Sequence, residues 1–270
     1  RHAYHGEGQP SAKRVLRAWN VGRAIYQRVQ SFVHPGDRVF EIGAGLGCTV
    51  KAFDLEGFEA SGIEPGVEFQ SFSRGTLHAD IENARLEDLA PVPAYDFVLL
   101  VHVIEHFSQP TRALRRIWSL LRTEGQLYVE CPNVYGPHAA PSRLFHYAHI
   151  YNFTPWTLKM MGESAGFRLV HELSSRDDAN LMFVFEKADT RRLVIDPSSY
   201  RKSVSAVQRY NTWTYHYRPR YAIRRVQTLS EQLNSVFFAR RRVRRLVAEL
   251  DRQDRERNPL QDRPQRLKAV

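Results

Sequence analysis

Three ionisable side chains stand close together in the middle of the chain, directly after its most apolar segment. His102, Glu105 and His106 are spaced i, i+3 and i+4, so they share a face on one helical turn. With His146 or His149 they would form an N/O ligand set for a divalent metal such as Mg²⁺. A neutral imidazole can also take a proton from a reacting hydroxyl. Metal ligand, general base and positioning group therefore stay open as roles for these residues.

A glycine-rich turn lies nearer the N-terminus, between a predicted strand and a predicted helix, and reads Glu41-x-Gly43-x-Gly45-x-Gly47. Glycine lets a ligand approach the main chain without meeting a Cβ atom. The spacing differs from the G-x-G-x-x-G of dinucleotide-binding turns. Glu64 ends the next predicted strand, where a carboxylate can accept hydrogen bonds from both hydroxyls of a ribose. A nucleoside-bearing cofactor is predicted; the alternatives are a nicotinamide-dependent oxidoreductase and a glycine turn without a ligand.

Strands and helices alternate around these motifs. The predicted strands cover residues 38–42, 58–63, 95–101, 126–131, 167–173 and 181–186, and the predicted helices cover residues 11–32, 46–56, 109–122 and 155–166. Because short loops join them, an open α/β sheet is predicted, mostly parallel with an antiparallel edge strand. Functional groups in such sheets lie at the carboxyl ends of the strands, which is where the glycine turn and the His102 segment fall.

Together these motifs resemble the class I, Rossmann-like S-adenosylmethionine-dependent methyltransferases, in particular their small-molecule branch. The resemblance covers about residues 35–187 and rests on the glycine turn, Glu64, the strand opened by Asp96, and the segments Phe153-Thr154-Pro155 and Ala165-Gly166-Phe167. It implies S-adenosylmethionine as the cofactor. The residues assigned to the cofactor are Glu41, Gly43, Ala44, Gly45, Gly47, Glu64, Pro65, Leu86, Val101 and His102.

The resemblance also implies roles for these residues. Glu41 and the backbone of residues 43–45 hold the methionine end, Glu64 takes the ribose, and Pro65 and Leu86 flank the adenine. Members of the family often bind the adenine amino group with an acidic residue after the third strand. Arg85 stands there in this chain, so that contact is unassigned.

For catalysis the candidates are Glu105, His106 and His149. Metal-dependent relatives, which include ubiquinone-pathway O-methyltransferases and small-RNA 2′-O-methyltransferases, carry two acidic residues and a histidine after the same strand. The small-RNA enzymes add a later histidine that is similar to His149. His102 stands here in place of the first acid, so the match is partial.

Charge divides the chain unevenly. Residues 191–270 hold 20 Lys and Arg against 7 Asp and Glu, whereas residues 1–190 hold 19 against 22. We therefore predict an N-terminal helical segment (1–34), a cofactor-binding domain (35–187) and a basic helical extension (188–270) with a long helix over 221–250. Its cationic patch consists of Arg240, Arg241, Arg242, Arg244 and Arg245.

Several partners suit this patch. Clustered arginines bind the phosphates of RNA or another polyanion, and basic amphipathic helices bind membrane surfaces. Alternatively, the helices form a homodimer or dock on the catalytic domain, with the arginines solvated or paired with Glu231, Glu249 and Asp251.

The two cysteines, Cys48 and Cys131, are expected to be buried free thiols in a cytoplasmic protein. The predicted function is O-methylation of a hydroxyl on a sugar, glycan or other small metabolite. The alternatives are an RNA methyltransferase that uses the basic extension and a catalytically silent cofactor-binding module.

Overall fold

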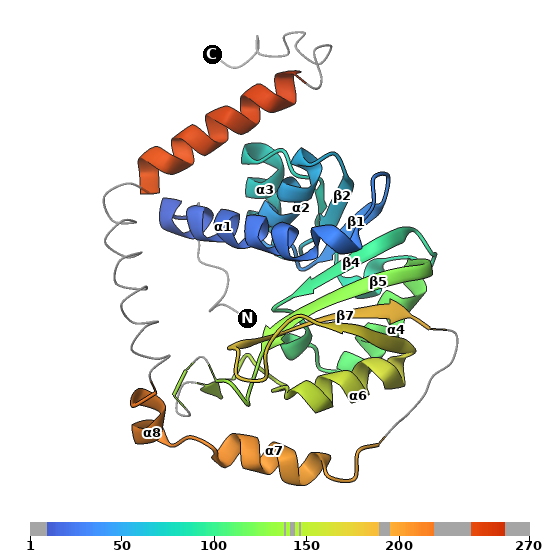
Figure 1. The fold of residues 1–270 in the computed structure, drawn as a ribbon. Helices are drawn as coiled ribbons and strands as arrows, with labels where there is room; N and C mark the ends of the chain where they lie inside the picture. The colour runs from blue at the N-terminus through green and yellow to red at the C-terminus, as the bar shows by residue number, and fades with distance from the viewer. Residues whose placement is uncertain are drawn as a thin grey trace.

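A seven-stranded sheet forms the centre of the computed structural model (Figure 1). The structure describes residues 10–137, 139–140, 144–145, 147–188, 195–218 and 239–256. The strand order is β3-β2-β1-β4-β5-β7-β6. The strands are β1 (Arg38–Ile42), β2 (Glu59–Ile63), β3 (Ile81–Glu82), β4 (Tyr95–Val101), β5 (Leu121–Pro132), β6 (Phe167–Glu172) and β7 (Asn180–Lys187).

The direction of the strands confirms the predicted sheet. β1 to β5 pair in parallel, so their carboxyl ends meet along one edge. β7 runs antiparallel to both β5 and β6, and it lies one place in from the edge because β6 takes the edge position. The order reverses between β1 and β4, and ligands of open α/β sheets bind at such a point.

Helices cover both faces of this sheet (Figure 1). Among the described residues the helices are α1 (Ala12–Val29), α2 (Cys48–Leu55), α3 (Val67–Thr76), α4 (Pro110–Leu120), α6 (Pro155–Ala165), α7 (Ser199–Gln208) and α8 (Thr212–His216), with the single 3₁₀ turns η1 (Gln30–Phe32), η2 (Leu86–Asp88) and η3 (Ile104–His106). A further helix spans residues 239–256.

The core divides between the two faces because successive side chains of a strand point to opposite sides. Phe97 and Leu99 of β4 belong to the cluster that includes Ile25 of α1 and Phe53 of α2. Their neighbours Val98 and Leu100 belong to the larger cluster beneath, which α4 and α6 cover. Because both faces of β4 are buried, its successive residues are apolar, which explains the continuous apolar run in the sequence.

The predicted helix ends are confirmed where the sequence contains a capping residue. The Ser11 hydroxyl accepts a hydrogen bond from the Arg14 amide at 3.4 Å, and Thr154 caps α6. Gly166 ends α6 with a φ of 108°, an angle that favours glycine. Both cysteines are buried free thiols, as predicted.

β5 is longer than predicted. It begins at Leu121 rather than Gln126, so α4 ends at Leu120 and not at residue 122. Leu121 is fully buried and pairs with Tyr95 of β4, which draws the chain into the sheet one residue after the helix. The elements α3 and β3 were not predicted from the sequence.

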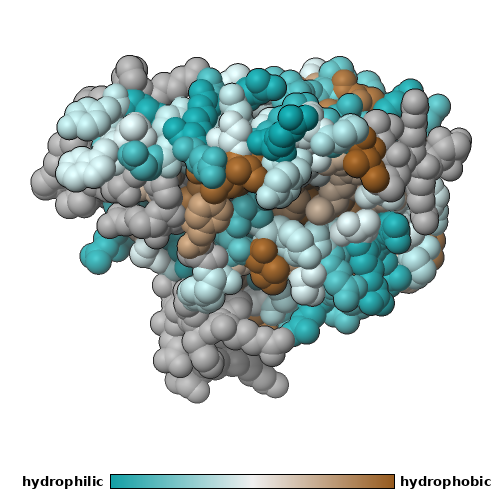
Figure 2. Space-filling model, turned by 90° about the horizontal axis from the view of Figure 1, so that it is seen from below, coloured by the Kyte–Doolittle hydropathy of each residue, from teal (hydrophilic) through white to brown (hydrophobic). Residues whose placement is uncertain are grey.

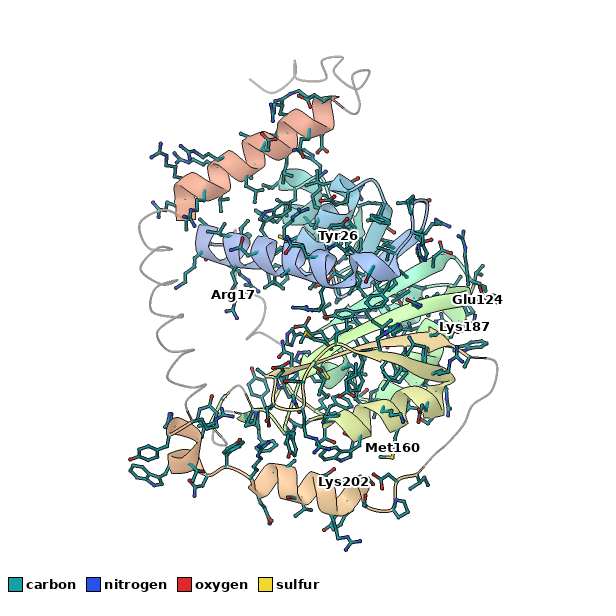
Figure 3. The ribbon with its side chains drawn as sticks, in the orientation of Figure 1. Arg17, Tyr26, Glu124, Met160, Lys187 and Lys202 are labelled. Atoms are coloured by element: carbon teal, nitrogen blue, oxygen red, sulfur yellow. The ribbon has the colours of Figure 1, made fainter. Side chains whose placement is uncertain are left out.

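The first part of the extension packs beneath the sheet. The Asp196 amide donates to the sulfur of Met160 on α6 at 3.4 Å, and Lys202 of α7 pairs with Asp196 at 2.6 Å (Figure 3). The guanidinium of Arg209 lies 4.3 Å from the centre of the Tyr135 ring. Contacts from two sides therefore fix α7 and α8 against the domain.

Figure 2 shows the face of the molecule that carries α7 and α8. Brown apolar atoms form separate patches there among teal and pale ones. The exposed aromatic side chains of this segment are Tyr200, Trp213 and Tyr217, and each carries a polar atom. Isolated apolar groups are normal on a protein surface, so this view shows no single continuous apolar docking area.

The helix over residues 239–256 overlaps the helix predicted for 221–250, of which residues 221–238 lie outside the described chain. The helix extends past its predicted end at residue 250, to residue 256. The last turns stay helical because Asp251 pairs with His78 and Asp254 pairs with Lys51. Nowhere in the described chain is a helix long and apolar enough to cross a bilayer.

Candidate active site

The glycine turn is open on one side and tightly packed on the other. Gly43, Gly45 and Gly47 have φ values of 72°, 55° and 72°, in the left-handed region that favours glycine. A Cβ atom on Gly45 would meet nothing within 4 Å, whereas one on Gly43 would lie 2.6 Å from Cγ2 of Val103. The turn therefore leaves space for a ligand at Gly45 and touches the segment that leaves β4 at Gly43.

Glu41 lies near the end of β1 as a buried acid, 4% exposed. Its Oε2 has no hydrogen-bond partner among the described residues. Burial raises the pKa of Glu41 to about 8, a hydrogen bond from Thr49 opposes the rise, and the charge of Glu64 adds to it. This oxygen can therefore accept a hydrogen bond from a ligand.

Glu64 reaches back to the turn from the end of β2. Its Oε2 accepts a hydrogen bond from the Gly45 amide at 2.9 Å, and its Oε1 accepts one from the Gly66 amide at 2.7 Å. Each oxygen keeps a second lone pair for a ligand hydroxyl. Pro65 is exposed beside it, and Ala44 is buried. The structure thus brings the residues predicted for ribose and methionine together around one turn.

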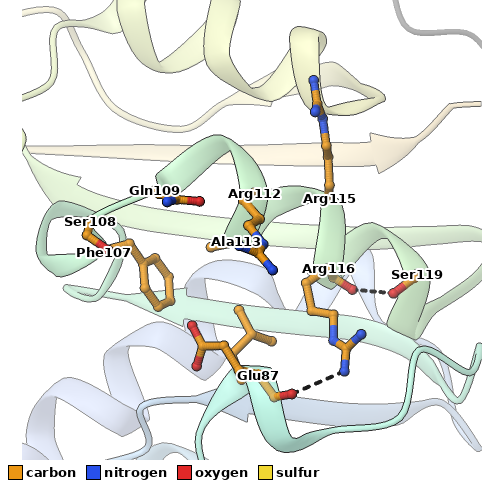
Figure 4. Close-up of a pocket in the computed structure, with 10 residues that line it drawn as sticks. Glu87, Phe107, Ser108, Gln109, Arg112, Ala113, Arg115, Arg116 and Ser119 are labelled. Atoms are coloured by element: carbon orange, nitrogen blue, oxygen red, sulfur yellow. Dashed lines mark hydrogen bonds between the residues drawn. The ribbon is translucent and has the colours of Figure 1, made fainter.

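Leu86, predicted to flank the adenine, is buried and lines a cavity of about 510 Å³ between η2 and α4 (Figure 4). Arg112 and Arg116 line the same cavity, and Arg116 donates to the carbonyl of Glu87 at 3.3 Å. None of the described residues that line it belongs to the glycine turn. The cavity is therefore separate from the glycine turn.

All three of the predicted catalytic residues come together at the end of β4. Glu105, His106 and His149 each offer one ligand atom, and these atoms lie within 4.8 Å of one another. Glu105 is 1% exposed, and neither carboxylate oxygen has a hydrogen-bond partner among the described residues. The rings of His106 and His149 meet edge to face with centroids 5.1 Å apart. His146 lies outside the described residues.

A backbone contact sets the orientation of His106. Its Nδ1 lies 2.6 Å from the carbonyl oxygen of Ala148, which can only accept, so Nδ1 donates. In the neutral ring Nε2 then carries the lone pair, which can bind a metal or take a proton. The amide of Tyr151 donates to the Glu105 carbonyl at 3.1 Å and holds the loop that carries His149 against this turn.

His102 stands outside this group. Its φ is 53°, and its Nδ1 lies 3.4 Å from Oε1 of Glu105. On its other side Asn180 lies 3.3 Å from Nε2 and donates to Glu130 at 2.7 Å. Burial disfavours the charged ring, but the neighbouring carboxylate of Glu105 and the charge of Glu130 outweigh it and raise the pKa of His102.

Arg17 opposes that rise in the pKa of His102, so its charge acts on the site from α1. It projects from the side of α1 that faces away from helix 239–256 (Figure 3).

The comparisons with known proteins agree with this geometry. A family model described as a methyltransferase domain matches residues 16–172, more than half of the chain. This chain belongs to that family. The matched part runs from α1 to the end of β6, so it includes the glycine turn and the Glu105 group and leaves out the basic extension.

Its relatives resemble only part of this methyltransferase. An uncharacterized protein of Mycobacterium tuberculosis is 31% identical over 118 residues, which cover 38% of this chain and 39% of that protein. A ubiquinone biosynthesis O-methyltransferase of Rhodopseudomonas palustris is 30% identical over 105 residues, 36% of this chain and 41% of that enzyme. The matches thus span 39% and 41% of the length of these relatives.

Solved structures show the same fold. A SAM-dependent methyltransferase of Archaeoglobus fulgidus superposes with a TM-score of 0.52 at 19% identity, over 63% of this chain and 94% of that one. The CcbJ methyltransferase of Streptomyces caelestis reaches 0.54 at 17% identity, over 62% and 89%. The predicted Rossmann-like methyltransferase fold is confirmed.

S-adenosylmethionine fits the residues of this methyltransferase. The open side of the turn at Gly45 leaves room for the ligand, and the unbonded oxygen of Glu41 suits an ammonium group. Glu64 is already oriented at the turn by two amides. Glu41 would therefore hold the methionine end, and Glu64 would hold the ribose.

A buried polar network next to His102 was not predicted from the sequence. The Tyr128 hydroxyl donates to Oε2 of Glu130 at 2.7 Å, and Arg28 of α1 donates to the same oxygen at 3.0 Å. Glu130 is buried, and acids are rarely buried without partners. An acid inside the apolar run of β5 was the available signal, but its partners Arg28 and Asn180 lie far away in the chain.

Proposed function

We propose that this methyltransferase transfers the methyl group of S-adenosylmethionine to a hydroxyl of a sugar, a glycan or another small metabolite. The observation that carries the proposal is the group of Glu105, His106 and His149, of which Glu105 and His106 lie directly after residues 102–103, the segment that leaves β4. That segment touches the glycine turn, since Val103 packs against Gly43. A proton acceptor and the methyl donor would therefore stand side by side.

Methyl transfer is an in-line displacement. The acceptor oxygen forms a bond to the methyl carbon while the carbon–sulfur bond breaks. The electron pair of the broken bond stays on sulfur to give S-adenosylhomocysteine. A hydroxyl must lose its proton in this step, so a base placed at it accelerates the transfer. Nε2 of His106 has the lone pair for that task, because Nδ1 donates to Ala148.

A divalent metal held by Glu105, His106 and His149 is the alternative to a His106 base, because Nε2 of His106 has one lone pair and cannot bind a metal and accept the proton together. The buried carboxylate of Glu105 fits such a role. Two imidazoles and one carboxylate suit zinc, iron or manganese better than Mg²⁺, which prefers oxygen ligands. A metal there would lower the pKa of the acceptor hydroxyl. His102, which pairs with Glu105, would orient this ligand.

The test is transfer of isotope-labelled methyl from S-adenosylmethionine to sugars, phenols and fractionated cell extract, with and without a chelator. We expect label in hydroxyl-bearing molecules as alkali-stable methyl ethers. Label only in amines or in alkali-labile esters would refute the hydroxyl assignment. Loss of transfer with chelator, restored by zinc or manganese, would support the metal; full activity in chelator would exclude it.

RNA methylation is the second candidate, and the five arginines from Arg240 to Arg245 favour it. All five are exposed, and none forms a salt bridge within the described chain. The predicted pairing of these arginines with Glu249 and Asp251 is wrong, because Glu249 pairs with Arg252 and Asp251 with His78, and the third predicted partner, Glu231, lies outside the described residues. The RNA candidate requires label in a nuclease-sensitive fraction and binding that weakens steeply with salt. Cofactor binding without transfer to any fraction would indicate a silent module.

A further inference from the structure

The helix over residues 239–256 covers the back of the glycine turn. Leu250 is 1% exposed and shares a buried cluster with Leu46 and Cys48. Leu46 belongs to the turn itself, and Cys48 is the first residue of α2. Val243 and Leu246, from the same side of the helix, pack against this cluster. The turn thus has an open side for the cofactor and a rear that is covered by this helix.

Two ion pairs lie along the same contact. Nζ of Lys51, in the first turns of α2, lies 2.8 Å from Asp54 and 2.7 Å from Asp254. Lys51 is 1% exposed, although lysine is almost never fully buried without a partner. Asp251 pairs with His78, which follows α3, at 2.9 Å. The helix therefore satisfies a buried charge of the domain as well as covering its apolar side chains.

This contact is not part of the family match, which ends at residue 172. The part of the chain that the family model recognises contains Leu46, Lys51 and Asp54 but neither Leu250 nor Asp254. This protein therefore completes its cofactor domain with a segment from its own extension.

We propose that helix 239–256 is required for tight cofactor binding, because it holds the glycine turn and α2 in the conformation that binds S-adenosylmethionine. Three left-handed glycines make the turn intrinsically adaptable. When only a fraction of the molecules has a binding-competent turn, the apparent affinity falls by that fraction. Leu250 and Asp254 are thus positioning residues for the cofactor. The proposed function concerns the acceptor and makes no statement about these two residues.

The arginines of this helix point to a different surface. Arg240, Arg241, Arg242, Arg244 and Arg245 are all exposed, whereas Leu250 is buried. The two faces can therefore be altered separately. An exposed arginine provides a matched control on the same helix, because its replacement by alanine removes a larger side chain and leaves the buried cluster intact.

The experiment is calorimetric titration of the full-length chain with S-adenosylhomocysteine, at a temperature where circular dichroism shows each variant to be folded. We expect Leu250→Ala to weaken binding by about tenfold or more, as for a turn that is competent in about a tenth of the molecules. Leu250→Met should restore most of the affinity, and Arg245→Ala should leave it unchanged. Equal affinities of Leu250→Ala and wild type would overturn the proposal, even if the variant is less stable.

A second variant and a measurement on the wild-type protein test the proposal independently of any misfolding of the Leu250→Ala variant. Asp254→Asn keeps the shape of the side chain and should also weaken binding. Coupling between two sites is reciprocal, so S-adenosylhomocysteine should slow amide hydrogen exchange in residues 239–256 of the wild-type protein. Exchange that is unaffected there while it slows in the glycine turn would contradict the proposal. Neither readout involves an acceptor, so failure of the proposed hydroxyl transfer would not affect them.

Discussion

Replacement of Glu41 by glutamine should stabilise the cofactor-free protein at alkaline pH and weaken its binding of S-adenosylmethionine. Burial raises the pKa of Glu41 to about 8, from 4.5 for the unperturbed group. A carboxyl with a higher pKa in the folded state binds its proton more tightly there than in the unfolded chain. The contribution of Glu41 to stability is therefore fully present below pH 4.5, falls as the pH rises toward 8, and changes no further above it.

The size of the effect follows from the two pKa values. A difference of about 3.5 units is worth ~5 kcal/mol in the free energy of unfolding, since each unit corresponds to ~1.4 kcal/mol. Glutamine is neutral at every pH and keeps a carbonyl that can accept the hydrogen bond from Thr49. The Glu41→Gln protein should thus exceed the wild type by several kcal/mol at pH 9, but by only about 1 kcal/mol at pH 5.

Urea unfolding at both pH values measures this difference, with Glu172→Gln as the control because Glu172 is an exposed acid on the edge strand β6. The same stability gain at pH 5 and pH 9 would refute the reasoning. So would a lower stability of Glu41→Gln at pH 9.

The same ionisation should be visible on cofactor binding. With a pKa near 8, Glu41 is about nine-tenths protonated at pH 7 in the free protein. An ammonium group bound there favours the carboxylate, so the wild type should release close to one proton. Calorimetry in buffers of different ionisation enthalpy detects this release, and Glu41→Gln should lose it together with affinity.

Three further substitutions test other parts of the molecule. Gly45→Arg should abolish binding of S-adenosylhomocysteine with the circular dichroism spectrum retained, because the side chain would fill the open side of the turn at a φ of 55°; calorimetry showing wild-type affinity would contradict this. His106→Asn should lower the transfer rate by roughly 10²- to 10⁴-fold, the usual range for a lost general base, at unchanged cofactor affinity. Retained activity would remove His106 from catalysis. Leu114→Ala, which truncates a buried side chain of α4, should cost about 2–5 kcal/mol of stability in urea unfolding, and a smaller loss would mean that the core closes around the cavity.

The parts of the fold that were predictable are those with local signals. Thr154-Pro155 and Gly166 mark the two ends of α6, because a cap, a proline at the first position and a left-handed glycine each act within a few residues. The glycine turn and Glu64 were predictable for the same reason: their roles depend on the strand that each one follows. The predicted range of β5 was too short because residues near its start, Arg122 to Gly125, are polar or lack a side chain. Pairing with β4 fixes this part of the strand instead.

The parts of the site that were not predictable depend on distant contacts. The spacing of His102, Glu105 and His106 suggested one shared helical face, but His102 adopts a left-handed backbone and turns toward Glu130 and Asn180. Asn180 lies on the antiparallel strand β7, whose pairing with β5 sets that contact. Likewise, no local pattern links Leu250 to the glycine turn.

Cys48 makes one motion of this protein measurable without any label or substitution. Its thiol is buried under Leu250, and burial, with a smaller contribution from the charge of Glu41, raises its pKa to about 12. A neutral, covered thiol does not react with disulfide reagents until it is uncovered. Cys131, fully buried in the central sheet, becomes accessible only when the domain itself opens. The ratio of the two thiol reaction rates in the unmodified protein would therefore report how often the cluster that Cys48 shares with Leu250 and Val15 opens before the rest unfolds.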